Sequence, residues 1–417
     1  MISIGLTGNV ASGKSTVARA WAELDVPVVS ADELARRAVA PGSEGLDRVV
    51  ELFGSGIVGP DGGMDRAAVR AIVFEDPEAR TRLESVIHPE VWRLRDAWLA
   101  EQRAAGADVV CSEIPLLFET GRADAFDVVV LVDAPEEVRL ARMVEDRGLD
   151  PTEARKMIAA QMPAVEKRAG SDHVVENTGT VDELRGAAFA TLDAVRGGKG
   201  MVVDLHLHTR GSWDCLSDPE AVLRRARSLG FQRIAITDHN RVHVGLRMAA
   251  AHPGSIIPGE EVKTAEGIDV IGLYLGEEIP KGTPAAETIE RIRAQGGVPL
   301  LPHPFAGGKG GGGRYAEELG PLCDVIEVFN ARLHDQGMNR RAAELAERLG
   351  SLTSAGSDAH TVGEVGNARN ELPTHPNTAD GLRAALTRVA TSGTEAPRIV
   401  HLASTWAKVA KKLPGIE

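Results

Sequence analysis

A glycine-rich stretch near the start of the chain has the residue types and spacing of a phosphate-binding loop. The residues from Gly8 to Ser15, GNVASGKS, match the pattern GxxxxGK[ST], between an apolar run at 2–6 and a helical pattern at 16–24. Its backbone N–H groups can wrap around phosphate oxygens, and the following helix adds positive potential. We expect Lys14 to reach the β- and γ-phosphates of a nucleoside triphosphate and Ser15 to bind Mg²⁺. The expected nucleotide-binding residues are Gly8, Asn9, Val10, Ala11, Ser12, Gly13, Lys14, Ser15 and Thr16.

Two carboxylates follow later apolar runs of the same half. Asp32 comes just after the run at 26–29, and Glu113 follows the run at 108–111. Ligands of a parallel sheet bind beyond the carboxyl ends of its strands, so Asp32 could take a proton from an acceptor hydroxyl. The position also suits a helix N-cap, and the two roles can coexist. Glu113 could orient a water bound to Mg²⁺, or it could be a buried, capped carboxylate.

Histidines and carboxylates recur at the ends of apolar runs in the second half of the chain. Asp204-Leu-His206-Leu-His208 places two imidazoles on the same side of a strand. In a β/α barrel the carboxyl ends of the strands form one face, where distant residues converge. Imidazole and carboxylate without thiolate suit Zn²⁺, Mn²⁺ or Fe, and such clusters activate water and bind phosphate oxygens. The expected ligands are His206, His208, Asp214, His239, Glu261, His303, Asp358 and His360.

Some of these ligands have alternatives. Glu260 competes with its neighbour Glu261, and the stretch Ser-Trp-Asp that ends at Asp214 could be only a turn. Glu327 and Asn330, in the stretch IEVFN, are weaker candidates. A single HxH pair is as well explained by a core or exposed histidine, but the joint occurrence of HxH, DH, HP and DxH favours a metal site.

Two series of short apolar runs must position these residues. The first alternates strand and helix patterns, which predicts a parallel α/β sheet, and it stops at Arg-Gly-Gly-Lys-Gly before Met201. We therefore expect a first domain at 1–196, a linker at 197–200 and a second domain at 201–417. The expected strands are 2–6, 26–29, 108–111, 128–132, 202–206, 234–237, 255–257, 270–275, 298–301, 325–329 and 352–355. A loop at Gly307–Gly313 and a basic amphipathic helix at Val400–Leu413 are also expected; the helix either packs on its own domain or binds a partner.

Composition excludes several classes of protein. The net charge of −13 over 417 residues argues against a general nucleic-acid binder, and no duplex nucleic acid is expected as a partner. Three scattered cysteines give no disulfide framework and fit a reducing compartment. Neither a signal peptide nor a membrane-spanning run is evident, so we expect a soluble, cytoplasmic protein; the sequence does not indicate its oligomeric state.

The first half resembles the dephospho-CoA kinases. The motifs GLTGNVASGKST, SADELARRAVAPG, IHP, IPLLFE and VDAPEEVRLARM occur in family order within about residues 1–195. The resemblance implies a P-loop kinase with a three-layer parallel sheet that uses ATP and Mg²⁺ to phosphorylate the 3′-hydroxyl of dephospho-CoA. It also implies that Asp32 is the catalytic base, that Arg142 contacts the transferring phosphate as a lid residue, and that Arg36 and His88 lie on the acceptor side. Many members have Asp-Ala-Asp where this chain has Ser-Ala-Asp before Glu33.

Four other basic residues of the first half are weaker candidates for phosphate contacts, because surface Arg and Lys side chains are usually only solvated. They are Arg139, Arg147, Lys167 and Arg168.

The second half resembles the PHP (polymerase and histidinol phosphatase) superfamily over about residues 201–395. DLHLHT, ITDHN, PGEEVKT, LPHPFAGG, IEVFN and GSDAH follow its motifs in its order. The resemblance implies a distorted (β/α)₇ barrel that holds two or three metals and hydrolyses a phosphate ester, and its Gly-x-Glu pattern selects Glu261. The ligands of a third metal and the identity of the ester do not follow from the motifs.

These observations together predict a bifunctional enzyme whose substrates are small molecules. Three alternatives remain at this point: a first domain that acts on another small hydroxyl compound such as a nucleoside, a second domain that binds metal without turnover, or a second domain that degrades RNA ends.

Overall fold

The computed structural model describes residues 1–198, 200–307 and 313–411. The chain divides into two compact units, one made of Met1–Ala22 and Val26–Ala188 and the other of Glu23–Asp25 and Phe189–Glu417. Most of the expected glycine-rich loop at Gly307–Gly313 and the last residues of the expected helix at Val400–Leu413 lie outside the described residues. The domain boundary expected at 197–200 stays a prediction.

The first unit is built on a parallel sheet with the strand order β2-β3-β1-β4-β5. Four of its strands lie where the sequence predicts them, and the short β5, in which one residue of four is fully buried, was not foreseen. The strands are β1 (Ile2–Thr7), β2 (Val28–Ser30), β3 (Val109–Glu113), β4 (Val128–Asp133) and β5 (His173–Glu176). In the register of the sheet, Leu6 of β1 and Ser30 of β2 both pair with Glu113 of β3, so the segments that follow β1 and β2 leave the sheet at the same edge.

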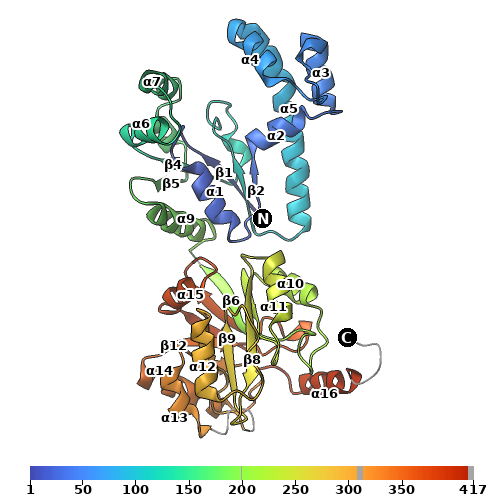
Figure 1. The fold of residues 1–417 in the computed structure, drawn as a ribbon, viewed down its shortest axis with the longest axis vertical. Coiled ribbons are helices and arrows are strands. Elements are labelled where there is room, and N and C mark those ends of the chain that lie inside the picture. Colours follow the sequence, from blue (N-terminus) through green and yellow to red (C-terminus); the bar gives the residue numbers. More distant parts are fainter. Residues whose placement is uncertain (199, 308–312, 412–417) are drawn as a thin grey trace. The chain divides into compact units, whose positions relative to one another are not determined.

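Helices connect these strands, and three of them form a separate cluster in the first unit, α3, α4 and the long α5 (Figure 1). This cluster has its own small core around Val49, Ile57 and Val69. The helices of the unit are α1 (Lys14–Ala22), α2 (Ala31–Ala38), α3 (Glu44–Phe53), α4 (Arg66–Glu75), α5 (Pro77–Ala104), α6 (Glu136–Glu145), α7 (Pro151–Ala159) and α8 (Ala164–Ala169). The next helix, α9 (Val181–Val195), begins in this unit and ends in the other.

The second unit contains a long sheet with the strand order β12-β11-β10-β9-β8-β7-β6-β13-β14. β6, β7 and β8 are parallel, as are β10, β11 and β12, whereas β9, β13 and β14 run antiparallel to their neighbours. The predicted α/β barrel is thus confirmed as a distorted one, and the polar or exposed strands β13 and β14 were not foreseen. The strands are β6 (Met201–Leu207), β7 (Arg233–Ile236), β8 (Ile256–Lys263), β9 (Asp269–Leu273), β10 (Val298–Leu301), β11 (Val325–Asn330), β12 (Leu352–Gly356), β13 (Ala368–Leu372) and β14 (Ala390–Gly393).

The sheet closes where the end of β6 meets the segment after β12. The amide of His208 donates to the carbonyl of Ala359 at 2.9 Å, and the amide of Asp358 donates to the carbonyl of His206 at 2.8 Å. Below this point Asn370 of β13 bridges the two strands, because its amide group donates to the carbonyls of Val203 and Ala355 and accepts from the Ala355 amide. The barrel therefore closes through residues beside the expected metal ligands.

Replacing the buried Asn370 with Ala is expected to destabilise the barrel. Three buried backbone groups would lose their partner, at about 1–3 kcal/mol for each unsatisfied group. Hydrogen exchange at the Ala355 amide should become faster than in the unmodified chain. The adjacent exposed residue offers a control, and Glu371→Ala should leave that exchange rate unchanged; equal exchange in the two variants would contradict the bridging role.

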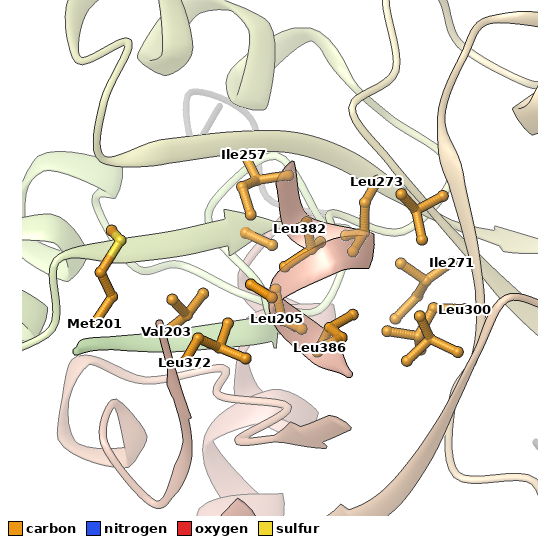
Figure 2. Close-up of a cluster of buried hydrophobic side chains, with 14 residues drawn as sticks. Met201, Val203, Leu205, Ile257, Ile271, Leu273, Leu300, Leu372, Leu382 and Leu386 are labelled. Atoms are coloured by element: carbon orange, nitrogen blue, oxygen red, sulfur yellow. The ribbon is translucent and has the colours of Figure 1, made fainter. Parts of the chain in front are cut away.

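Apolar side chains fill the barrel at the end where the strands begin. Figure 2 shows side chains from β6, β8, β9, β10 and β13 packed with Leu382 and Leu386 of α15. The expected metal ligands lie at the opposite end of the barrel, where most of the parallel strands end. The helices of the unit are α10 (Pro219–Ser228), α11 (His243–Ala251), α12 (Ala285–Ala294), α13 (Ala316–Leu319), α14 (Gln336–Leu349), α15 (Ala379–Leu386) and α16 (Val400–Ala410). Within the described residues, no helix combines the length and apolar character that crossing a bilayer requires.

Candidate active sites

The phosphate loop of the first unit links β1 to α1, as its sequence predicts. Gly8 and Gly13 have φ angles of 152° and 103°. A Cβ on Gly8 would lie 2.3 Å from the Val132 carbonyl oxygen, and one on Gly13 would lie 2.3 Å from the amide nitrogen of Asn177. Both positions therefore require glycine, because a side chain would collide with fixed neighbours.

Lys14 folds back over this loop. Its ammonium donates to the carbonyl oxygens of Gly8 at 2.8 Å and Asn9 at 3.1 Å. Burial lowers the pKa of Lys14 to about 8, although the nearby carboxylates of Glu113 and Asp32 act in the opposite direction. The hydroxyl of Ser15 donates to Glu113 at 3.0 Å, so the two expected Mg²⁺-side groups are in contact.

The lowered pKa of Lys14 predicts a pH-dependent affinity for ATP. Phosphate binding favours the ammonium form, which the free protein loses as pH rises through about 8. The dissociation constant of MgATP should therefore be about ten-fold larger at pH 9 than at pH 7, with proton uptake on binding at the higher pH. Calorimetric titrations at the two pH values measure both effects. Lys14→Met should remove the pH dependence, and a dependence of the same size in that variant would contradict the assignment.

A cavity of about 350 Å³ adjoins the loop, and Arg142 and Arg147 line it. Arg142 donates to the carbonyl of Ala11 at 3.2 Å and to the side-chain oxygen of Asn177 at 3.0 Å. Asn177 in turn donates to the carbonyl of Ser12 at 2.7 Å. Asn177 was not foreseen from the sequence, and its only signal is its place in AAQMPAVEKRAGSDHVVENTG at 159–179, a further stretch that resembles the dephospho-CoA kinases.

The other basic candidates of the first unit are held in local contacts. Arg168 pairs with Asp133 at 2.6 Å and with Glu176 at 2.7 Å. Lys167 is fully buried and pairs with Glu119 at 2.8 Å, and Arg139 donates to the carbonyl of Ala134.

A second cavity, of about 330 Å³, lies on the Asp32 side of the sheet. Asp32 and His88 line it, while the exposed Arg36 does not, and its acceptor-side role stays a prediction. The alternative in which Asp32 is the N-cap of α2 is wrong, because the Ser30 hydroxyl caps this helix by accepting from the Asp32 amide. The carboxylate of Asp32 is thus left in the first turn of α2, beside the cavity.

Three residues of this cavity were not foreseen, and two of them lie in the segment 77–104, which has only the pattern of a long helix. Trp92 and Arg95 come from α5, and Arg122 joins them from the segment after β3. The guanidinium carbons of Arg95 and Arg122 lie 5.2 Å and 5.0 Å from the Trp92 ring centroid. They add positive charge to the acceptor side.

In the second unit the expected ligands converge at the mouth of the barrel. His208 is central: its Nε2 lies 3.3 Å from Nε2 of His206, 3.3 Å from Glu261 and 3.2 Å from Asp358. Four groups of buried side chains bring their ligand atoms within 4.8 Å of one another. These groups are His208–His239–His360, His206–His208–Glu261, His206–His303–Asp358 and Glu261–Asp269–His303.

Glu261 and Asp214 each join this cluster. Glu261 contacts Nδ1 of His239 at 3.0 Å and Nε2 of His303 at 3.1 Å. The neighbouring Glu260 instead accepts from the Ile279 amide at 2.9 Å. Asp214 lies 3.4 Å from Nε2 of His360 and 3.6 Å from Nε2 of His239. The arrangement favours Glu261 over Glu260 and places Asp214 beside the other expected ligands. That these side chains bind a metal stays a prediction.

Glu327 and Asn330 support the cluster. Glu327 accepts from the His303 amide at 2.8 Å and contacts Nδ1 of His206 at 2.9 Å, which leaves Nε2 of His206 facing the other ligands. Asn330 donates to Glu327 at 3.0 Å. Such contacts fix the orientation of ligating imidazoles.

Asp269, a buried carboxylate at the start of β9, was also not foreseen from the sequence. It groups with Glu261 and His303, and its carboxylate pairs with Lys263 across the antiparallel β8–β9 ladder at 2.9 Å. The unforeseen antiparallel direction of β9 explains the omission, because it brings the beginning of this strand, and not its end, to the mouth of the barrel.

The ionisation of the cluster reflects the buried carboxylates that surround its imidazoles. Burial disfavours the imidazolium of His206, yet the carboxylates of Glu327, Asp358 and Glu261 outweigh burial and raise the pKa of His206 well above its ordinary value. The same balance raises the pKa of His208 to about 9. Burial likewise opposes ionisation of Glu261, but the surrounding imidazoles hold its pKa well below the usual range. The cluster therefore attracts cations, and divalent ions would displace these protons.

The residues present fit a metal centre. Oδ1 of Asp214 and Nδ1 of His303 are buried and have no hydrogen-bond partner among the described residues. Buried polar atoms normally find a partner, so such atoms beside other donors fit the coordination of an ion. The donors are imidazole nitrogens and carboxylate oxygens, which suit Zn²⁺, Mn²⁺ or Fe.

A cavity of about 760 Å³ opens at the cluster. Asp214, His239, His303 and Asp358 line it together with basic residues. The basic residues are Lys263, Lys281, Arg332 and Lys408. Imidazoles and carboxylates that could hold cations at the base, with basic side chains around the wall, are features that can bind a phosphate ester.

These two sites define the class of each unit. The phosphate loop, with a carboxylate across a second cavity, is the architecture of a P-loop phosphotransferase, and the second unit is a metal-binding α/β barrel.

Comparison with known proteins specifies the families. Residues 2–183 match the sequence model of the dephospho-CoA kinase family, residues 204–290 that of the PHP domain, and residues 337–391 that of the PHP-associated segment. A dephospho-CoA kinase of Geobacter metallireducens is 46% identical over 183 residues, which are 44% of this chain and 91% of the relative. One of Anaeromyxobacter dehalogenans is 44% identical over 197 residues, covering 47% and 93% of the two chains. A solved structure from Thermus thermophilus is 40% identical, with a TM-score of 0.41, and covers 46% of this chain and 97% of its own.

The chain belongs to the dephospho-CoA kinase family, and it carries a PHP domain behind the kinase part. Both resemblances expected from the sequence are thereby confirmed. The PHP domain is a family of metal-dependent phosphoesterases.

Proposed function

We propose that the first unit transfers the γ-phosphoryl group of ATP to the 3′-hydroxyl of dephospho-CoA, giving coenzyme A and ADP, with Asp32 as the base. The observation that carries the assignment of the base is the position of Asp32. It follows β2 at the same sheet edge where the phosphate loop follows β1, and it lines a cavity of about 330 Å³.

In this reaction Asp32 accepts the proton of the 3′-hydroxyl, and the 3′-oxygen of dephospho-CoA attacks the γ-phosphorus. The bond from that phosphorus to the β–γ bridging oxygen breaks, and ADP leaves. Lys14 and Arg142 stabilise the negative charge on the transferring group. Ser15 and Glu113 would hold Mg²⁺, which neutralises phosphate charge when bound.

The substrate is tested by incubating the full chain with MgATP and either dephospho-CoA or a nucleoside. Coenzyme A should form with dephospho-CoA and be detected by chromatography. Faster phosphorylation of the nucleoside would replace this proposal with the alternative acceptor.

We propose that the second unit hydrolyses a phosphate ester of a small molecule. The convergence of buried imidazoles and carboxylates under a cavity lined by ammonium groups supports this activity. His206, His208, Asp214, His239, Glu261, His303, Asp358 and His360 would hold two or three ions of Zn²⁺, Mn²⁺ or Fe, with Asp269 as an additional ligand. The bound ions supply positive charge for the phosphoryl oxygens and acidify water.

The test is phosphate release by the Mn²⁺-loaded chain from small esters and from a short labelled RNA. Release from small esters is the expected result. Tight metal binding without hydrolysis would indicate a non-catalytic domain, and shortening of the RNA alone would indicate a nuclease.

A further inference from the structure

The helix α16, at the edge of the second unit (Figure 1), exposes a stripe of large apolar side chains. The α16 stripe consists of Ile399, Leu402, Trp406 and Val409, each of which is between 52% and 69% exposed. At about 100° per residue, the four positions fall within an arc of about 80° around the helix axis. Contiguous apolar surface of this kind on the outside of a folded domain marks a contact site for another molecule.

The opposite side of α16 fixes the helix to the barrel. Arg332 donates to the Ser404 hydroxyl at 2.9 Å, and Lys411 donates to the carbonyl of Ser212. Between these two points Lys408 lines the cavity of the expected metal ligands. The basic helix expected from the sequence thus packs on its own domain, and the α16 stripe has a fixed orientation.

The helix follows the last segment that the family models match, which ends at residue 391. The α16 stripe is therefore not a feature that the family assignment explains.

The charges of the helix argue against a lipid surface as the partner of the stripe. Helices that lie on membranes carry Lys and Arg along the polar side of an apolar face. Here the ammonium of Lys408 lies 4.5 Å from the ring centroid of Trp213 and Lys411 binds backbone carbonyls, so both are turned towards the barrel. The exposed side chains described between Ile399 and Val409 are uncharged, and the net charge of −13 opposes binding to anionic lipid. The stripe fits another uncharged apolar surface better.

The α16 stripe is complementary to itself when two copies of the helix run antiparallel. Its spacing of three, four and three residues is that of the a and d positions of a coiled coil. The four positions are also symmetric about residue 404, since Ile399 and Val409 lie equally far from it, as do Leu402 and Trp406. A two-fold axis at this point would bring Leu402 against Trp406 of the partner subunit and Ile399 against Val409 of the partner subunit.

We propose that the α16 stripe binds the same stripe of a second copy of this chain and forms a two-fold symmetric dimer. Each apolar side chain then contacts its counterpart in an isologous interface, with the two indoles near the centre. The helix has 11 residues, so it is about 16 Å long and presents far less than the ~800 Å² per partner of a standard interface. The dimer should therefore dissociate in the micromolar range. The inference is independent of the two proposed activities.

Sedimentation velocity of the full chain between about 1 and 100 μM tests the proposal, since the expected affinity lies in this range. The mass should rise from one chain to two as the concentration increases. Trp406→Glu should weaken the association by about thirty-fold or more, the loss typical of a central interface tryptophan. The variant should keep the melting temperature of the monomer, because Trp406 is exposed in one chain. The matched control is Phe74→Glu, which places the same charge at an exposed ring of α4 and should leave the dimer intact.

Two cysteine variants test the direction of the helices. A mixture of Ile399→Cys and Val409→Cys chains should form a disulfide-linked dimer under mild oxidation, and each variant alone should not. The native cysteines do not interfere, because all three are buried. Cross-linking of each variant with itself would indicate parallel helices and overturn the proposed arrangement.

Other outcomes would reject the dimer itself. These are a single-chain mass at every concentration, or a dimer that survives Trp406→Glu. Sedimentation of the monomer with vesicles of phosphatidylcholine and phosphatidylglycerol, lost in Trp406→Glu, would replace the second copy with a lipid surface.

Discussion

Asp32→Asn is expected to lower the rate of coenzyme A formation by about 10²–10⁴-fold, the usual contribution of a general base. Asparagine keeps the shape of the side chain but cannot accept the proton of the 3′-hydroxyl. The phosphate loop does not use Asp32 for its own hydrogen bonds, and Asp32 is the smallest of the charges that act on the pKa of Lys14, so ATP affinity at pH 7 should change little. Single-turnover rates with dephospho-CoA and titration with MgATP measure the two quantities.

The adjacent acidic residue provides the matched control for this experiment. Glu33 is exposed on the same turn of α2 and does not line the acceptor cavity, so Glu33→Gln should retain full activity. If Asp32→Asn kept its rate, the proton would have to leave by another route, and the catalytic assignment of Asp32 would be wrong.

Glu261→Gln is expected to reduce the metal content of the second unit and to lower phosphate release by at least about 10²-fold. The carboxylate of Glu261 contacts four of the clustered imidazoles, and a neutral amide provides neither the charge nor the second anionic oxygen that they require. Losses of this size are typical when the residues around a metal are disturbed. Elemental analysis of the purified chain and phosphate release with Mn²⁺ measure the two effects.

Glu260→Gln tests the same chemical change one residue away. Burial raises the pKa of Glu260 to about 7, and its side chain accepts from the Ile279 amide, a bond that glutamine can also make. This variant should keep both its metal and its activity. Equal metal loss in the two variants would indicate a general weakening of β8, and unchanged metal content in both would remove Glu261 from the ligand set.

The sequence was sufficient for the features that depend on local pattern. The phosphate loop combines a strand, a turn that only glycine allows and a helix within about twenty residues, so its position followed directly. The main strands of both sheets were predictable because they are buried on both faces and have continuous β-branched runs. The convergence of the expected ligands at the strand ends was predictable for a different reason. Side chains alternate along a strand with a period of two, which places His206 and His208 on the same side.

Features that depend on pairing between distant strands were not predictable. β13 has a half-polar sequence, and it pairs with β6, which lies near the start of the second unit in sequence. No local pattern therefore predicts β13 as a strand. The direction of β9 decides that Asp269 faces the cluster, and direction is set by packing. The position of α16 beside the cavity of the expected metal ligands was not predictable either. Amphipathicity indicates that one face of a helix packs, but it does not indicate which part of the protein that face contacts.

The closure of the barrel has a consequence for the order in which the protein matures. Ser357 donates its amide to Asp204, which lies 153 residues earlier in the chain, beside His206. A growing chain therefore cannot assemble the complete ion-binding pocket until the ribosome has passed His360, long after the residues of the nucleotide-binding unit have emerged. Any metal ion held by the expected ligands would therefore be taken up late in biosynthesis, when the first and the last parts of the barrel are both present.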